Sequence, residues 1–229
     1  IVIRWSRAFG YECASMSLAL MGGTFDPVHV GHLRSAEEVA SLLDFRTIRL
    51  IPSYIPPHRR LPGTSALQRL KMLKLAIQDN AQIEVDDREV RREGRSYSVD
   101  TLAEIRQEIG DVEPLCFVLG IDAFRLVEEW HRWRELTDYA HLIVMSRPEM
   151  NAHPRDQAMS EVLNAWIESR KGELQDVSLT PAGSVCFIEL TQLAVSSTSI
   201  REMVLARQST RYLLPESVRN FIDENGLYR

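Results

Sequence analysis

The chain contains few cysteines and no long hydrophobic run. Cys13, Cys116 and Cys186 are far apart in the sequence and form no C-x-x-C pair. An odd, scattered set argues against a disulfide framework or a zinc site and favours a reducing compartment, so we expect a cytoplasmic protein. No apolar run approaches the length that spans a bilayer, so we expect no membrane association.

An excess of basic residues is also missing. The net charge of -5 gives no general attraction to nucleic acid, and we expect no nucleic-acid partner. A chain of 229 residues is long enough for one sizeable core. We expect a flexible N-terminal extension over residues 1–15 and a single domain over residues 16–229, with a helical subdomain from about residue 196. The sequence is compatible with a homo-oligomer and does not specify one.

Two common nucleotide-binding motifs are absent, the P-loop G-x-x-x-x-G-K-[ST] and the dinucleotide fingerprint G-x-G-x-x-G. In their place, the apolar run 18–21 is followed by Gly22 and Gly23, and a helical pattern starts at about Val30. This order predicts a strand, a glycine turn and a helix N-terminus, where amide groups and the helix dipole form an anion site.

Two histidines, His29 and His32, lie three residues apart at this helix start, so both rings can face one spot. The tetrapeptide H-x-G-H alone is a weak signal. Glycines that only turn the chain, with histidines that cap the helix or pack, would explain it equally well.

The rest of the chain alternates between strand and helix patterns. Strands are predicted at 18–21, 47–51, 82–85, 115–119, 141–145 and 185–190. The alternation predicts an α/β fold, a Rossmann-like doubly wound parallel sheet with helices on both faces and a small C-terminal helical part. Ligands bind such sheets at the carboxyl ends of the strands, and the polar motifs of this chain all follow strands.

Helix boundaries are predicted from local signals. Ser65 and Gln68 form a capping box that opens one helix, and Ser98 is expected to cap another. We expect a charged loop over 86–95 and a mostly helical segment over 123–136. Further helices are predicted near 159–169, from Ser196 and from Pro215 to Gly226.

Several polar residues after strands are candidate ligands of a nucleotide. Hydroxyls and amides at the helix start 196–199 would bind phosphate oxygens, and Arg201 could reach them as a fork, although simple N-capping would also explain the serines. Asp122, after Gly120, could bind ribose hydroxyls or a metal-bound water, or could cap a helix. Arg147 could touch a phosphate or be a surface charge.

Two longer strings carry a family resemblance. The string G-G-T-F-D-P-V-H-V-G-H resembles the nucleotide-binding signature of the nucleotidylyltransferase superfamily, and S-S-T-S-I-R resembles its I-S-S-T-x-x-R motif, with Val195 in place of the usual Ile. The resemblance implies catalytic roles for His29, His32 and Arg201. It implies an ATP site formed by Gly22, Gly23, Thr24, Phe25, His29, His32, Gly120, Asp122, Arg147, Ser197, Thr198 and Arg201.

Three further segments narrow the resemblance to bacterial nicotinate mononucleotide adenylyltransferases. These are P-P-H-R at 56–59, S-Y-S-V-D-T at 96–101 and W-H-R-W at 130–133. An ordinary surface loop at 56–59 and core packing of Trp130 and Trp133 are the alternatives without a ligand. We assign Trp133 to the core. The resemblance implies a mononucleotide site formed by Pro57, His58, Arg59, Tyr97, Ser98, Thr101 and Trp130.

The resemblance implies adenylyl transfer from ATP to nicotinate mononucleotide in NAD biosynthesis, giving nicotinate adenine dinucleotide and pyrophosphate. Mg²⁺ would accompany ATP without dedicated protein ligands. Phosphopantetheine adenylyltransferase shares both phosphate motifs and is the alternative enzyme. A non-catalytic nucleotide sensor on the same fold is the alternative from another class.

Overall fold

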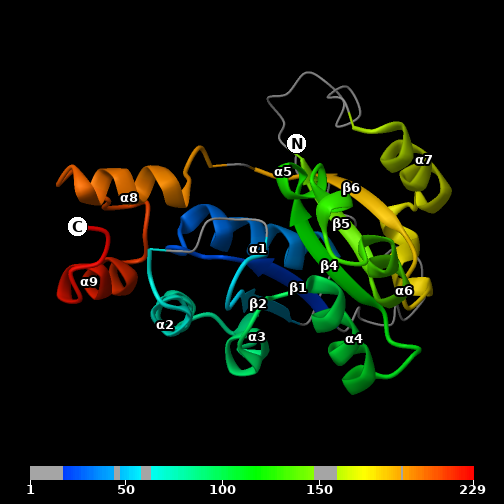
Figure 1. The fold of residues 1–229 in the computed structure, drawn as a ribbon, viewed down its shortest axis with the longest axis horizontal. Coiled ribbons are helices and arrows are strands. Elements are labelled where there is room, and N and C mark those ends of the chain that lie inside the picture. Colours follow the sequence, from blue (N-terminus) through cyan, green and yellow to red (C-terminus); the bar gives the residue numbers. More distant parts are fainter. Residues whose placement is uncertain (1–17, 44–46, 58–62, 147–158, 192) are drawn as a thin grey trace.

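The computed structural model describes residues 18–43, 47–57, 63–146, 159–191 and 193–229. Within them, six strands form one sheet in the order β3-β2-β1-β4-β5-β6, and every neighbouring pair is parallel (Figure 1). The strands are β1 (Leu18–Gly23), β2 (Ile48–Pro52), β3 (Ile83–Val85), β4 (Leu115–Gly120), β5 (His141–Ser146) and β6 (Val185–Glu189). All six predicted strands and the doubly wound parallel sheet are confirmed.

The strand order reverses between β1 and β4. The chain runs outward from β1 through β2 to β3, and it then returns to place β4 on the other side of β1. In a doubly wound sheet the connections after two such strands pass to opposite faces, which leaves a crevice at their carboxyl ends. The fold therefore provides a ligand site where the first glycine turn lies.

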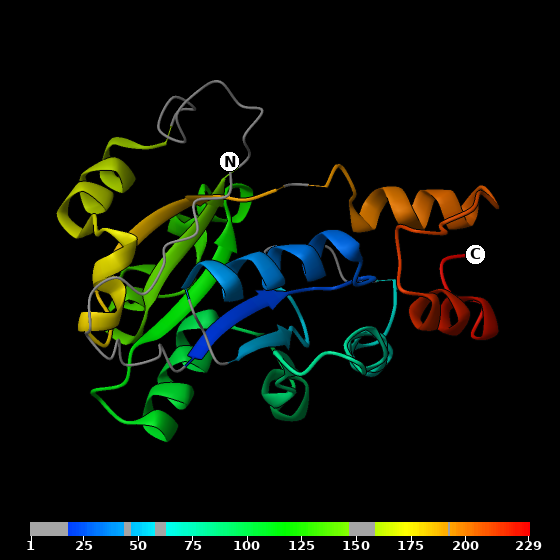
Figure 2. The ribbon, with the colours of Figure 1, turned by 180° about the vertical axis from the view of Figure 1, so that it is seen from behind.

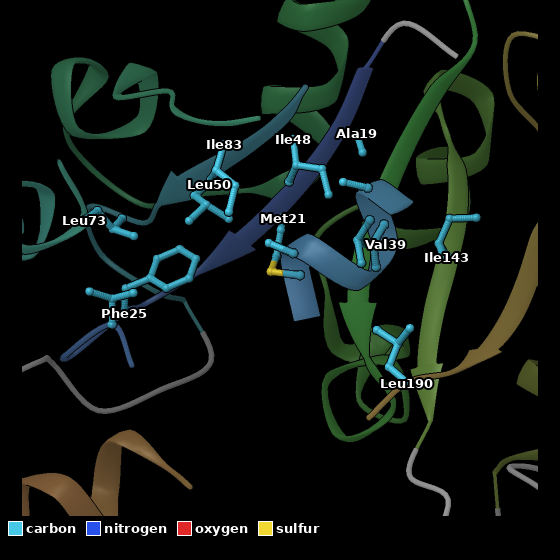
Figure 3. Packing of buried hydrophobic residues seen from close by; sticks show 14 of the residues in the cluster. Ala19, Met21, Phe25, Val39, Ile48, Leu50, Leu73, Ile83, Ile143 and Leu190 are labelled. Atoms are coloured by element: carbon cyan, nitrogen blue, oxygen red, sulfur yellow. The ribbon is translucent and has the colours of Figure 1, made fainter. Parts of the chain in front are cut away.

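Helices cover both faces of the sheet, and alternate strand residues face each layer. Helix α1 (Val30–Leu43) buries Ala36 and Val39 against Ala19 and Met21 of β1, in the core cluster shown in Figure 3. The opposite face packs on α4 (Ser98–Ile109), α6 (Leu136–Tyr139) and α7 (Glu161–Arg170). Successive side chains of a strand point to opposite faces of the sheet, and helices cover both faces. The strands are therefore apolar on both sides.

The last two helices, α8 (Ser197–Leu205) and α9 (Glu216–Glu224), lie beyond the carboxyl end of β1, and α9 packs beside α2 (Ala66–Ala76) (Figures 1 and 2). The Ser217 hydroxyl donates to the Leu75 carbonyl at 2.9 Å. Ile200, Val218 and Ile222 join the same apolar cluster as α1. The C-terminal helices thus form the predicted small helical part, and the start of α8 lines the crevice.

One capping prediction is confirmed and one is wrong. Ser65 with Gln68 forms a capping box as predicted, and Ser196 caps α8 in a second capping box, which was the alternative interpretation of these serines. Ser98 is not a cap: it is the first residue of α4, and Tyr97 stands at the N-cap without a side-chain hydrogen bond. Since no side chain satisfies the first amides of α4, they are left for other partners.

Two segment predictions also differ from the structure. The charged loop 86–95 contains the short helix α3 (Arg88–Arg92), where the Arg88 amide bonds the Asp86 carboxylate at 3.0 Å. The segment 123–136 is not one helix. It is broken into α5 (Ile121–Phe124), two 3-10 turns at Val127–Glu129 and Trp133–Glu135, and the start of α6, because Arg132 adopts a left-handed φ of 52°.

Some expectations lie outside the described residues, namely the extension over 1–15 and the side chains of His58, Arg59 and Arg147. In the described part of the chain, no helix combines the length and the apolar character needed to cross a membrane.

Candidate active site

A cavity of about 850 Å³ opens at the carboxyl ends of β1 and β4. It brings together every predicted site residue that the structure describes. These are Gly22, Gly23, Thr24, Phe25, His29, His32, Pro57, Tyr97, Ser98, Thr101, Gly120, Asp122, Trp130, Ser197, Thr198 and Arg201. Residues that are up to 179 positions apart in the sequence therefore share one wall, which separate surface turns would not do.

The turn from β1 to α1 leaves no space for a side chain at the glycines on either side of it, Gly23 at the end of β1 and Gly31 at the start of α1. A Cβ atom on Gly23 would lie 2.9 Å from the Phe25 ring, and Phe25 itself has a positive φ of 51°. A Cβ atom on Gly31 would lie 3.0 Å from Nδ1 of His29 and 2.9 Å from a methyl group of Val195. The glycine of H-x-G-H is therefore needed because the first histidine ring packs against its backbone.

The two histidine rings stack at this helix start. Their centroids are 3.7 Å apart and their planes differ by 25°. The backbone N–H of His29 donates to Nδ1 of His32 at 3.3 Å, so Nε2 carries the proton of the neutral His32 ring. Phe25 contacts His32 edge-on at 5.1 Å between centroids. His32 thus has a fixed tautomer and a fixed orientation.

His29 is more deeply buried than His32, with 6% of its surface exposed. Burial lowers the pKa of His29 to about 4, so the ring is neutral at pH 7. Its Nδ1 atom is buried and has no hydrogen-bond partner among the described residues. A ring in this state is a hydrogen-bonding group and not a fixed cation.

The start of α1 offers an anion fewer free amide groups than the sequence predicts. The Val30 amide donates to the Leu213 carbonyl at 3.0 Å. One amide expected to face a ligand is therefore satisfied by the segment between α8 and α9. The histidine rings and the helix dipole remain as the features of α1 that favour an anion.

Helix α8 approaches this loop from the other side. Its capping box uses the hydroxyls of Ser196 and Ser199, and the Ser197 hydroxyl donates to the Pro27 carbonyl at 2.9 Å. The predicted phosphate ligand Ser197 thus ties α8 to the first motif through its hydroxyl. The amides of Ser197 and Thr198, at the first two helical positions, have no intrahelical partner by geometry.

The Arg201 guanidinium lies between the two motifs. It donates to the Asp26 carbonyl at 2.7 Å and to the Thr198 hydroxyl at 3.3 Å, and it lies 4.0 Å from the Asp26 carboxylate. We call this part of the cavity the polar end, defined by His29, His32, Ser197, Thr198 and Arg201. It offers hydrogen-bond donors from two helices to one anionic group.

Aromatic rings line the opposite part of the cavity, the aromatic end, which is defined by Tyr97, Phe117, Trp130 and His131. The Tyr97 and His131 rings lie 4.6 Å apart, and Phe117 meets Trp130 edge-on at 6.4 Å. The uncapped start of α4 at Ser98 lies in the same wall. Flat apolar faces beside free amides suit a planar ring that carries an anionic substituent. Trp133 is buried in the core, as predicted.

Thr101, predicted to contact a ligand, makes an internal hydrogen bond instead. Its hydroxyl donates to the Glu89 carboxylate at 2.6 Å. Burial raises the pKa of Glu89, while its hydrogen bonds with Thr101 and Ser96 oppose that rise. Glu89 also lines the cavity and was not predicted, because it lies in the segment read as a charged loop.

Other lining residues were missed for lack of a local signal. Asp26 stands inside the first motif, but nothing in the motif alone shows which groups its carboxylate bonds. Phe117 is one apolar residue in an apolar strand, and His131 follows a tryptophan in a segment interpreted as helix. Only the three-dimensional arrangement distinguishes these residues from their neighbours.

Comparisons with known proteins agree on the family. A family model described as cytidylyltransferase-like matches residues 20–203. Proteins named "Probable nicotinate-nucleotide adenylyltransferase" from Pseudomonas fluorescens and Methylococcus capsulatus are 43% and 44% identical to this chain. They cover 93% and 92% of it, and 97% and 99% of their own length.

A solved structure shares the fold at low sequence identity. It is Plasmodium falciparum nicotinic acid mononucleotide adenylyltransferase complexed with NaAD, which is 16% identical, has a TM-score of 0.68, and covers 93% of this chain and 97% of its own. The family assignment rests on the sequence relatives, which align over nearly their whole length, because a structure at 16% identity shows the fold alone. The chain therefore belongs to the nicotinate-nucleotide adenylyltransferase family, among the cytidylyltransferase-like proteins.

Proposed function

We propose that this protein transfers the adenylyl group of ATP to nicotinate mononucleotide, giving nicotinate adenine dinucleotide and pyrophosphate in NAD biosynthesis. One observation carries the proposal: the polar end and the aromatic end belong to a single cavity of about 850 Å³. A polyphosphate at the first and a pyridine ring at the second would lie in one space, so that the two substrates can meet.

The reaction exchanges one phosphorus–oxygen bond for another. An oxygen of the mononucleotide 5′-phosphate bonds to the α-phosphorus of ATP, and the bond from that phosphorus to the bridging oxygen breaks to release pyrophosphate. The attacking phosphate is already ionised at pH 7, since its second pKa is about 6. No general base is required, so alignment and charge stabilisation can supply the catalysis.

The polar end would hold the ATP phosphates as charge moves onto the leaving pyrophosphate. His32 would donate from Nε2, Arg201 from its guanidinium, and the start of α8 from the amides of Ser197 and Thr198. The neutral ring of His29 would stand beside these donors as a hydrogen-bonding group. Donors fixed before reaction stabilise developing charge without reorganisation.

The remaining predicted ATP contacts that the structure describes also line the cavity. ATP would contact the backbone of the first loop at Gly22, Gly23, Thr24 and Phe25. Gly120 would let the nucleoside approach the end of β4, where the Asp122 side chain is 68% exposed. We also keep Arg147, which lies outside the described residues, as a proposed phosphate contact.

Mg²⁺ would arrive with ATP. The described residues contain no group of three His, Cys, Asp or Glu side chains that could hold a metal, which suits an ion bound by substrate phosphates and water. The carboxylates of Asp26 and Glu89 on the cavity wall accept from protein donors, and Asp122, a third carboxylate on this wall, would reach a metal-bound water. The ion would neutralise phosphate charge.

The aromatic end would select the nicotinate form. The pyridine ring would lie among Tyr97 and Trp130, and its carboxylate would accept from the amides that begin α4 at Ser98. A carboxamide would present its own NH₂ group to those donors, and unmatched buried polar groups discriminate strongly between ligands. Pro57 would aim the loop that carries His58 and Arg59 toward the mononucleotide, and Thr101 would support this wall from within α4.

We further propose a cytoplasmic enzyme, because the buried free thiols of Cys116 and Cys186 suit a reducing compartment. The single-domain organisation from residue 16 and the helical subdomain from about residue 196 stay predictions, and a homo-oligomer remains compatible with them.

The test is ATP-dependent release of pyrophosphate with different acceptors. Nicotinate mononucleotide should support fast release, whereas nicotinamide mononucleotide, phosphopantetheine and no acceptor should support little. Preferred use of phosphopantetheine would identify the alternative enzyme. ATP binding without release under any condition would identify a nucleotide sensor.

A further inference from the structure

The Asp26 carboxylate lies at a junction of three segments. One of its oxygens, Oδ1, accepts from the Thr64 hydroxyl at 2.5 Å and from the Tyr228 hydroxyl at 2.7 Å. The other, Oδ2, accepts from the Gly63 amide at 3.2 Å. Asp26 is buried, with 4% of its surface exposed, so each of these bonds lies where water competes poorly for it.

Tyr228 makes the longest connection of the three. It lies 202 positions from Asp26, just beyond α9, with a left-handed φ of 63°. Its ring packs against the same apolar cluster as α1. Burial, followed by the nearby Asp26 charge, raises the pKa of Tyr228, so its hydroxyl keeps the proton that it donates.

Asp26 also receives the Arg201 guanidinium, through its backbone carbonyl at 2.7 Å and at 4.0 Å through its carboxylate. The same residue thus joins Tyr228 on one side and Arg201 on the other. Tyr228 is not among the described residues that line the cavity. Its hydroxyl can therefore act on the cavity through its acceptor Asp26, which lines it.

We propose that Tyr228 is a positioning residue for adenylyl transfer: its hydroxyl fixes Asp26, and Asp26 fixes the Arg201 guanidinium at the polar end. This inference rests on the proposed function. It assigns the segment after α9 a part in catalysis, although none of the described residues of that segment lines the cavity. Small displacements of a positioned group reduce the rate when catalysis depends on alignment.

The test compares Tyr228→Phe with Tyr212→Phe. The first change removes the hydroxyl and keeps the ring, and we expect kcat to fall about tenfold at saturating substrates, with KM for the mononucleotide nearly unchanged. Tyr212 also has a positive φ, of 67°, but is 84% exposed, so its variant should match the wild type. Thr64→Val removes the other hydroxyl that donates to the same carboxylate oxygen, so it should also lower kcat.

A double-mutant cycle tests the route. In an Arg201→Lys background, Tyr228→Phe should lower kcat less than about twofold, because a lysine cannot keep the fork that Asp26 orients. A wild-type kcat in Tyr228→Phe would overturn the inference, and so would an undiminished tenfold loss in the lysine background. Absence of pyrophosphate release by the wild type would contradict the proposed function instead.

Discussion

At the residue scale, His32 is the group whose state the structure fixes most completely. Its Nδ1 accepts from the His29 amide, and its ring is held between His29 and Phe25. We expect His32→Ala to lower kcat by about 10²–10³ with a small change in ATP affinity, because a donor to the developing charge is lost. Steady-state kinetics and ATP titration measure the two effects, and a variant that kept most of its kcat would leave His32 a packing residue.

The same residues show how far single positions could be predicted. The placement of H-x-G-H and of Arg201 at one cavity was predicted from the motifs and the family resemblance and is confirmed, whereas their catalytic roles stay a prediction. The fixed tautomer of His32 and the use of the Ser197 hydroxyl as a tie to Pro27 did not. Both depend on partners that the fold brings near, and a hydroxyl in a sequence does not show which acceptor it meets.

At the element scale, the start of α4 carries the proposed selectivity. Ser98→Pro should remove one amide donor and leave the helix intact, because proline is accepted at the first helical position and Tyr97 already has the extended backbone that must precede it. We expect the ratio of kcat/KM for nicotinate over nicotinamide mononucleotide to fall about tenfold or more. Ser98→Ala keeps the amide and should keep the ratio, and equal ratios in the two variants would refute this account.

Elements were predicted where local chemistry decides them. The apolar strands and the capping boxes at Ser65 and Ser196 specify their own boundaries. The segment 123–136 has helical composition, yet Arg132 breaks it with a left-handed backbone. Its Trp133 side chain packs in the core against Trp166, 33 positions later in the chain. Tertiary packing outweighs local propensity there, and no window of sequence contains that information.

At the scale of the whole molecule, buried histidines make stability depend on pH. Burial lowers the pKa of His29 to about 4 and also lowers that of His141, whereas an unfolded histidine titrates near 6.5. The unfolded chain therefore binds more protons, so stability is full above about pH 6.5 and falls as the pH drops toward the folded pKa. For His29 the loss between pH 7 and pH 5 is about 2 kcal/mol.

Chemical unfolding at pH 5, 6 and 7 measures this dependence. The variant His29→Asn should lose less free energy of unfolding than the wild type over that range, by about 2 kcal/mol. The remaining slope includes His141, whose Nδ1 accepts from the Ser184 amide at 3.2 Å and would lose that bond on protonation. Parallel slopes in wild type and variant would show that His29 is not buried neutral.

The whole-molecule arrangement was predictable in outline only. Alternating strands and helices predicted that the motifs meet at one sheet edge, and the cavity at β1 and β4 confirms the meeting. The hydrogen bond by which Tyr228 holds Asp26 of the first motif spans 202 positions. Such long-range pairs leave no periodic trace in the sequence.

The central claim is that an oxygen of the mononucleotide phosphate attacks the α-phosphorus of ATP, and an isotope experiment tests it most directly. Nicotinate mononucleotide carrying ¹⁸O in its phosphate oxygens is converted with unlabelled ATP, and mass spectrometry locates the label. Direct attack keeps every labelled oxygen in the dinucleotide and none in pyrophosphate, because the attacking oxygen becomes the bridge between the two phosphorus atoms. Label in pyrophosphate, or a dinucleotide that has lost label, would contradict the account.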